Sequence, residues 1–123
     1  MCNVSLGKKG EDQAAASLES AGMTIIARNF KAQSANGVKL GEIDIIAIDK
    51  DTVVFTEVKT WTVYSQEDLL YGIDAKKQRK IIKTAKYFLS ENRKYNNMAI
   101  RFDVIFVKDN SVNHLVSAFT ESV

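Results

Sequence analysis

The chain has 123 residues, of which 46% are apolar and 26% charged, a composition typical of one globular domain. Its net charge is +2, and its single cysteine and single histidine exclude an internal disulfide and a metal site built from several of these residues. No stretch approaches the length of about 20 apolar residues that a membrane-spanning helix needs. We therefore expect one cytoplasmic domain without membrane contact, in which any metal would be bound by oxygen ligands.

The first part of the chain predicts a helix and a strand. Apolar residues recur at helical spacing over residues 6–21, and Gly22 follows where a left-handed cap residue belongs. Residues 24–30 are β-branched and apolar enough for a short strand. The polar stretch 31–37 then predicts a loop.

A β-hairpin is expected next. Two runs rich in Val, Ile and Phe, residues 40–48 and 53–60, are separated by a polar tetrapeptide. Residues 61–72 show no clear period and are expected to connect the hairpin to a second helix.

The second helix is predicted over residues 74–92, with Asp74 as its N-cap and an apolar stripe along one face. Two further strands, residues 100–107 and 112–119, flank a polar turn. The expected order is α-β-β-β-α-β-β, so the fold class is a mixed α/β domain.

The register of the hairpin brings acidic residues together. With a loop of two or four residues, the numbers of paired residues sum to 101, so Asp44 lies opposite Glu57. The two acids continue an otherwise apolar face of the hairpin. Lys59 follows two residues after Glu57 and is expected opposite Glu42.

Two like charges that face each other across a ladder cost about 0.2 to 1 kcal/mol, so a compensating cation is expected. Mg²⁺ or Mn²⁺ fits, because these ions prefer oxygen ligands and Mg²⁺ is often held by only one or two carboxylates. Lys59 would then supply a point charge to a phosphate oxygen or an attacking water. The alternative is a structural ion pair of Lys59 with Glu57 or Glu42 on a solvated end of the hairpin.

A third acid, Glu11, lies on the same helical stripe as Ala14, Ala15 and Leu18, so the first helix turns a carboxylate towards the core. The alternative role is stabilisation of the helix N-terminus by negative charge.

Basic residues cluster on the second helix. They are expected on its outward faces with few acids among them, and the residues are Lys76, Lys77, Arg79, Lys80, Lys83 and Lys86. Such a stripe can bind the phosphates of DNA regardless of sequence. The alternative is a solvated helix face.

The remaining candidates receive structural interpretations. Aromatic residues at 61, 64 and 71 fit packing over the core better than base stacking. His114 is expected at the surface or in packing, and Asp103 in a salt bridge with Arg101.

Two motifs resemble those of a known superfamily. Gly-Glu-Ile-Asp at 41–44 and Glu-Val-Lys at 57–59 resemble the metal-binding signature of the PD-(D/E)XK nucleases. Over nearly its full length the chain resembles the small bacterial YraN-like family, which is similar in fold to archaeal Holliday junction resolvases. The matching blocks are residues 7–11 with Ala14, Gly22 with residues 25–29, and residues 41–47, 54–60, 77–79, 101–104 and 114–119.

This resemblance implies a single nuclease-like domain, residues 1–123, with a restriction-endonuclease-like fold in which helices flank a mixed central sheet. It implies that Asp44 and Glu57 are metal ligands, that Lys59 is the catalytic lysine and that Glu11 is the acid of the first helix. The chain departs from the family pattern over 61–74, where the family commonly has a basic residue soon after the lysine and a Phe-Gly pair.

The favoured hypothesis is a Mg²⁺- or Mn²⁺-dependent endonuclease that hydrolyses phosphodiester bonds in DNA, including branched DNA. A resolvase-like activity would favour a homodimer, because a junction presents two symmetric cuts. The competing hypothesis is a non-catalytic nucleic-acid-binding or complex-assembly module that retains the fold. Metal binding without cleavage of structured DNA would favour the second hypothesis.

Overall fold

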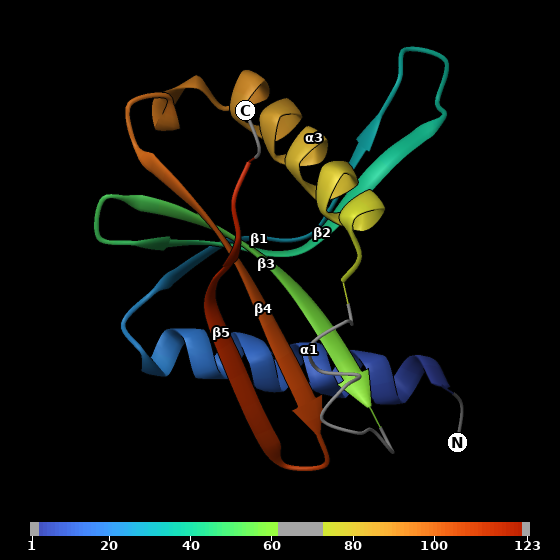
Figure 1. Ribbon diagram of the computed structural model, residues 1–123, viewed down its shortest axis with the longest axis vertical. Coiled ribbons are helices and arrows are strands. Elements are labelled where there is room, and N and C mark those ends of the chain that lie inside the picture. Colours follow the sequence, from blue (N-terminus) through green and yellow to red (C-terminus); the bar gives the residue numbers. More distant parts are fainter. Residues whose placement is uncertain (1–2, 62–72, 122–123) are drawn as a thin grey trace.

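The computed structural model describes residues 3–61 and 73–121, and within these ranges five strands form one sheet with a helix on each face (Figure 1). The elements are α1 (Asn3–Ser20), β1 (Thr24–Gln33), β2 (Lys39–Asp49), β3 (Thr52–Trp61), α3 (Ala75–Glu91), the 3₁₀ turn η1 (Arg93–Tyr95), β4 (Ala99–Lys108) and β5 (Ser111–Phe119). The strands lie in chain order across the sheet. β3 and β4 are parallel and the other neighbours antiparallel, so the sheet is mixed.

The predicted order α-β-β-β-α-β-β and the mixed α/β fold class are confirmed. The polar stretch predicted as a loop from residue 31 was partly wrong, because β1 continues to Gln33 and pairs with β2 as far as Lys39. Backbone pairing with the neighbouring strand outweighs the weak strand propensity of this stretch. The predicted connection lies almost wholly outside the described residues, and so do Tyr64 and Tyr71.

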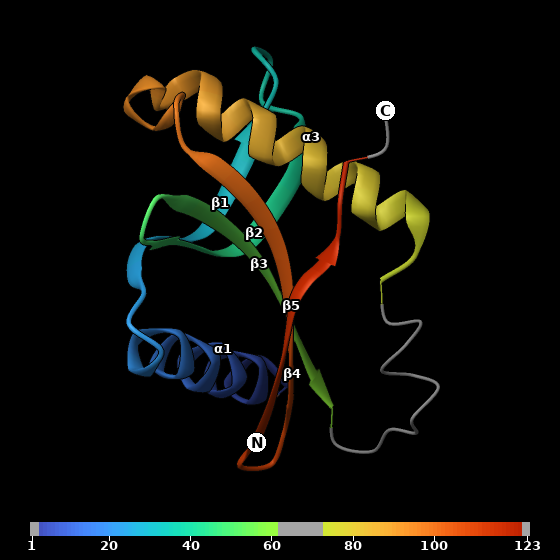
Figure 2. The same cartoon turned by 60° about the vertical axis from the view of Figure 1, so that its left-hand side comes forward.

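Each helix covers one face of the sheet, as the view in Figure 2 shows. α1 buries its predicted stripe against side chains of β2, β3 and β4, and these residues are Ala14, Ala15, Leu18, Ile45, Ala47, Val54, Val58, Ile105 and Val107. α3 packs on the opposite face, in a cluster that contains Ile43, Ile46, Val53, Phe55, Ile81, Ala85, Phe88 and Phe102. No helix among the described residues is long and apolar enough to cross a membrane.

The ends of α3 agree with the sequence prediction. The side chain of Asp74 accepts a hydrogen bond of 2.8 Å from the backbone N–H of Lys77, as an N-cap residue does. Asn92 is the C-cap. The cap fixes where α3 begins, and therefore which of its residues face the sheet.

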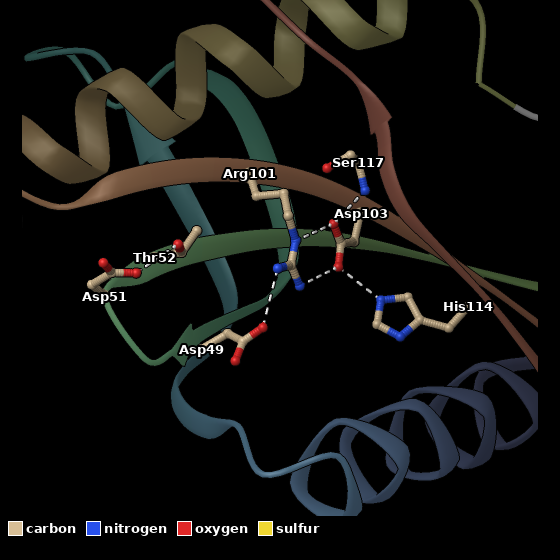
Figure 3. A network of polar contacts seen from close by, with 7 residues as sticks. All are labelled: Asp49, Asp51, Thr52, Arg101, Asp103, His114 and Ser117. Carbon is tan, nitrogen blue, oxygen red and sulfur yellow. Dashed lines mark hydrogen bonds and ion pairs between the residues drawn. The ribbon is translucent and has the colours of Figure 1, made fainter.

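A polar network ties β4 to β2 and β5 on the α1 side of the sheet (Figure 3). Asp103 is fully buried and accepts hydrogen bonds of 2.9 and 3.0 Å from Nε and Nη2 of Arg101. His114 Nε2 lies 2.7 Å from Asp103 Oδ2, and the backbone N–H of Ser117 donates to Oδ1. Arg101 also bonds Asp49 at 3.1 Å. The predicted Arg101–Asp103 salt bridge is confirmed.

The partners of Asp103 keep it ionised. Burial raises its pKa, but the hydrogen bonds from His114, Arg101 and the backbone of Ser117 lower it by more, so the pKa lies below its ordinary value. The network therefore stabilises the folded state only while Asp103 is a carboxylate.

We predict that Asp103→Ala lowers the free energy of unfolding by about 3–5 kcal/mol, because the largely buried guanidinium of Arg101 loses two of its hydrogen bonds and keeps only the one to Asp49 among the described residues. The folded pKa is depressed, so the contribution is present above the unfolded pKa of about 3.9 and is lost as the pH falls through the folded pKa. Urea unfolding at pH 7 and at pH 3 measures both effects. Asp51→Ala, an exposed acid in the β2–β3 turn, is the control, and equal losses in the two variants would contradict the prediction.

Candidate functional site

A cavity of about 290 Å³ lies where the ends of the paired segments of β2 and β3 meet the first turns of α3. Asp44 and Glu57 both line it. The full lining is Lys39, Gly41, Glu42, Asp44, Glu57, Lys77, Lys80 and Ile81. The structure thus brings together the two acids that the hairpin register placed opposite each other.

The register itself is confirmed, since Ile46 pairs with Phe55 and Ile45 with Thr56. The backbone pairs between β2 and β3 end at Ile45 and Thr56, one position before the two acids. Instead of a backbone pair at the next position, Asp44 Oδ2 accepts a hydrogen bond of 2.8 Å from the backbone N–H of Val58. The carboxylate is therefore held rigidly against β3.

The expected position of Glu42 opposite Lys59 was wrong. Glu42 instead forms an ion pair of 2.7 Å with Lys39 on its own strand. The β2–β3 ladder ends at the Ile45–Thr56 pair, so Glu42 does not pair with Lys59 across it.

The acids of the site repel each other. Burial, and next the charge of Glu57, raise the pKa of Asp44 to about 7, although the bond from Val58 opposes this. Glu57 is only 9% exposed. A pKa raised by burial and by a like charge is a common property of functional sites.

Lys59 lies beside the acids, although it is not among the described residues that line the cavity. Burial lowers its pKa, and so does the neighbouring Lys77, while Glu57 and Asp44 act in the opposite direction. A half-buried ammonium between carboxylates and a second ammonium is the environment in which a lysine readily changes its charge.

Glu11 approaches the site from α1 on the other side of the hairpin. Burial, and next the charge of Asp44, raise its pKa. Its Oε1 lies 3.7 Å from Nη2 of Arg28, so Glu11 already has a cationic partner. Glu11 therefore adds negative potential near Asp44 but is not among the residues that line the cavity.

Lys77 was expected on an outward face of its helix, and this was wrong. Its Nζ lies 3.4 Å from Glu57 Oε1, inside the acidic site. The signal was present in the sequence, because Lys77 precedes Ile81 by four residues and Phe88 by eleven, and so belongs to the buried stripe. Apolar residues alone therefore do not mark the whole sheet-facing stripe of α3, because Lys77 lies at the same helical phase.

The other basic residues of α3 lie along a second cavity, of about 500 Å³. It is lined by Lys76, Arg79, Lys80, Lys83 and Lys86, together with apolar and polar residues that include Glu121. Lys80 lines both cavities, and Lys86 forms an ion pair with Glu121. The basic face of α3 is therefore continuous with the acidic site.

Two glycines allow the helices to approach the site. A Cβ on Gly41 would lie 2.1 Å from Oγ1 of Thr84 in α3, and a Cβ on Gly10 would lie 2.2 Å from Oγ1 of Thr60 in β3. Only glycine permits such contacts without movement of the helix or the threonine. Gly10 and Gly41 therefore determine how closely α1 and α3 pack on the sheet, and so how closely the charged residues of the two helices approach the acids.

The donor set fits a small hard cation. No cluster of three or more Asp, Glu, His or Cys arranged to hold a metal occurs in the described part of the chain. Asp44 and Glu57 offer two carboxylates at one cavity, and Mg²⁺ is usually bound by one or two carboxylates with water in its remaining positions. These two residues would hold the metal.

Comparison with known proteins agrees with the family resemblance. Residues 10–107 match the family described as "Uncharacterised protein family UPF0102". The chain belongs to this family. A UPF0102 protein of Treponema denticola is 43% identical over 129 residues, covering 94% of this chain and 95% of the relative. UPF0102 proteins of Treponema pallidum (strain Nichols) and Francisella tularensis subsp. novicida are 42% and 38% identical, each covering 97% or more of both chains.

We predict that Gly41→Ala lowers the stability of this UPF0102 protein by about 1–3 kcal/mol, because the added methyl overpacks the β2–α3 contact. The clash is with Thr84 Oγ1, which donates to the carbonyl of Lys80. In a Thr84→Ala background the same substitution should therefore cost clearly less. Thermal unfolding of the two single variants and the double variant measures this coupling, and additive losses would contradict the proposed contact.

Proposed function

We propose that the protein is a divalent-metal-dependent endonuclease that hydrolyses phosphodiester bonds in DNA, with branched DNA as the expected substrate. The observation that carries the proposal is the meeting of Asp44 and Glu57 at one cavity, beside Lys59 and a basic helix face.

In this proposal each residue of the site has a separate role in hydrolysis. Asp44 and Glu57 would hold a Mg²⁺ or Mn²⁺ ion, which when bound lowers the pKa of water and neutralises charge on a phosphate. The bond from Val58 fixes the direction of the Asp44 carboxylate. Lys59 lies beside the acids and would hold a phosphate oxygen or orient an attacking water, and burial, with Lys77 next to it, lowers its pKa from the ordinary value.

The basic face of α3 would bind the DNA backbone. Lys76, Arg79 and Lys83 are exposed and line the second cavity, next to the acidic site. A phosphodiester chain bound along α3 would pass the acids at the first turns of the helix. Substrate phosphates and the hydrolytic residues would then lie on one side of the sheet.

A second candidate function, a non-catalytic nucleic-acid-binding or assembly module, is favoured by one observation. Among the described residues no group of three or more Asp, Glu, His or Cys could hold a metal, and Glu11 and Glu42 are paired with Arg28 and Lys39. Such a module would bind DNA through α3 and would not cleave it.

We predict that Asp44→Asn and Lys59→Met each abolish Mn²⁺-dependent cleavage of a panel of linear, nicked and four-way-junction DNAs. Asp44→Asn should also lose metal binding, whereas Lys59→Met should retain it. Asp51→Asn and Lys50→Met make the same chemical changes in the exposed β2–β3 turn and should leave cleavage unchanged. Metal binding by the wild type without cleavage of any DNA would favour the non-catalytic module.

Asp44→Asn should fold and be at least as stable as the wild type in EDTA, because the substitution removes a like-charge contact and keeps an acceptor for Val58. Thermal unfolding in EDTA tests this point. A clear loss of stability there would instead support a structural role for the carboxylate.

We predict that replacing Lys76, Arg79 and Lys83 by glutamate removes most DNA affinity. Each lost phosphate contact should reduce the slope of log K against log salt by about 0.9. Lys80 is left in place because it also lines the acidic cavity. The control replaces Lys9, Lys31 and Lys50, which are exposed on other elements, and has the same change in net charge. Equal affinity of the two triple variants would show that the helix face is only solvated.

A further inference from the structure

The acidic site contains an ammonium group supplied by α3. Lys77 Nζ lies 3.4 Å from Glu57 Oε1, and Glu57 is one of the two carboxylates that would bind the metal. Lys77 also lines the cavity itself, whereas Lys59 is not among its described lining residues. The position expected for a divalent cation is therefore next to a cation that belongs to the chain.

Three local features hold Lys77 in this place. Asp74 caps the backbone N–H of Lys77 and so fixes the first turn of α3. Gly41 lets α3 lie close to β2. Lys77 follows the buried stripe, one turn before Ile81, and its side chain therefore leaves the helix towards the sheet.

The ion pairs of the site are selective. Glu11 pairs with Arg28 and Glu42 with Lys39, so these two acids have cations of their own. The ion pair recorded for Glu57 among the described residues is with Lys77. Removal of Lys77 therefore changes the charge balance at Glu57 more than at the other acids.

An ammonium and a divalent cation on the same carboxylate repel each other, and the repulsion is strong at a group as little exposed as Glu57. We infer that Lys77 is an internal counter-ion that competes with the divalent cation for Glu57, and that its ammonium leaves the carboxylate when the metal binds. This inference rests on the proposed metal site.

The departure of Lys77 needs no movement of the helix. Its side chain is 41% exposed, and a lysine ammonium is carried on a flexible four-carbon stem. The ammonium can turn towards solvent or towards a phosphate of bound DNA while the backbone of α3 stays in place. Without metal, Lys77 neutralises part of the acidic pair and stabilises the fold, and with metal it weakens the affinity of the site.

The test measures binding of Mn²⁺ alone by isothermal titration calorimetry to the wild type, Lys77→Met, Lys77→Arg and Lys80→Met. Lys80→Met is the matched control, because it removes the same charge from the same helix and cavity. Lys77→Met should bind Mn²⁺ about tenfold more tightly, which corresponds to about 1.4 kcal/mol. Lys77→Arg and Lys80→Met should remain close to the wild type. In EDTA, Lys77→Met should melt at a lower temperature than Lys80→Met.

The outcomes separate this inference from the proposed function. Equal affinities of all four proteins, or the same increase in both methionine variants, would overturn the competition while leaving the metal site intact. Loss of cleavage in Lys77→Met with unchanged Mn²⁺ affinity would also overturn it, because Lys77 would then act on the substrate. Absence of Mn²⁺ binding in every variant would overturn both the competition and the metal site.

Discussion

The meeting of two carboxylates at the end of the β2–β3 ladder is the constraint on which the site depends. Burial and like charge raise the pKa of Asp44 to about 7, so the folded chain would lose stability there unless positive charge is brought close. Lysines from two elements supply this charge: Lys59 on β3 and Lys77 on α3. Lysine charges are mobile, and a site balanced by them can exchange its own cation for a bound one.

The close approach of the helices follows from the same constraint. Lys77 reaches Glu57 because α3 packs closely on β2, and Gly41 leaves room for Thr84 at that contact. On the other face, Gly10 opposite Thr60 brings α1 to β3 and sets Glu11 within the field of Asp44. The two helices therefore position charged side chains near the same acids, and they also cover the apolar faces of the sheet.

Much of this arrangement could be predicted from the sequence. Strand periodicity and the polar tetrapeptide determine the hairpin register, which brings Asp44 and Glu57 together, and capping chemistry marks the ends of α3. Contacts between elements distant in the sequence could not be predicted in this way. The ion pair of Lys77 with Glu57 depends on the helix phase and on how deeply α3 sits, and the extension of β1 to Gln33 depends on its pairing with β2.

Two acids of the same sheet show why the site differs from the rest of the core. Asp103 is fully buried, yet its pKa is lowered, because Arg101, His114 and a backbone N–H satisfy both of its oxygens. Asp44 is less buried by exposed area, yet its pKa is raised, because burial and next the charge of Glu57 outweigh the single hydrogen bond from the backbone N–H of Val58. The buried carboxylate on the α1 side of the sheet, Asp103, is therefore stabilised in its charged form, whereas the carboxylate on the α3 side, Asp44, is not. A local conflict of this kind, next to a cavity and a basic helix, is typical of functional sites.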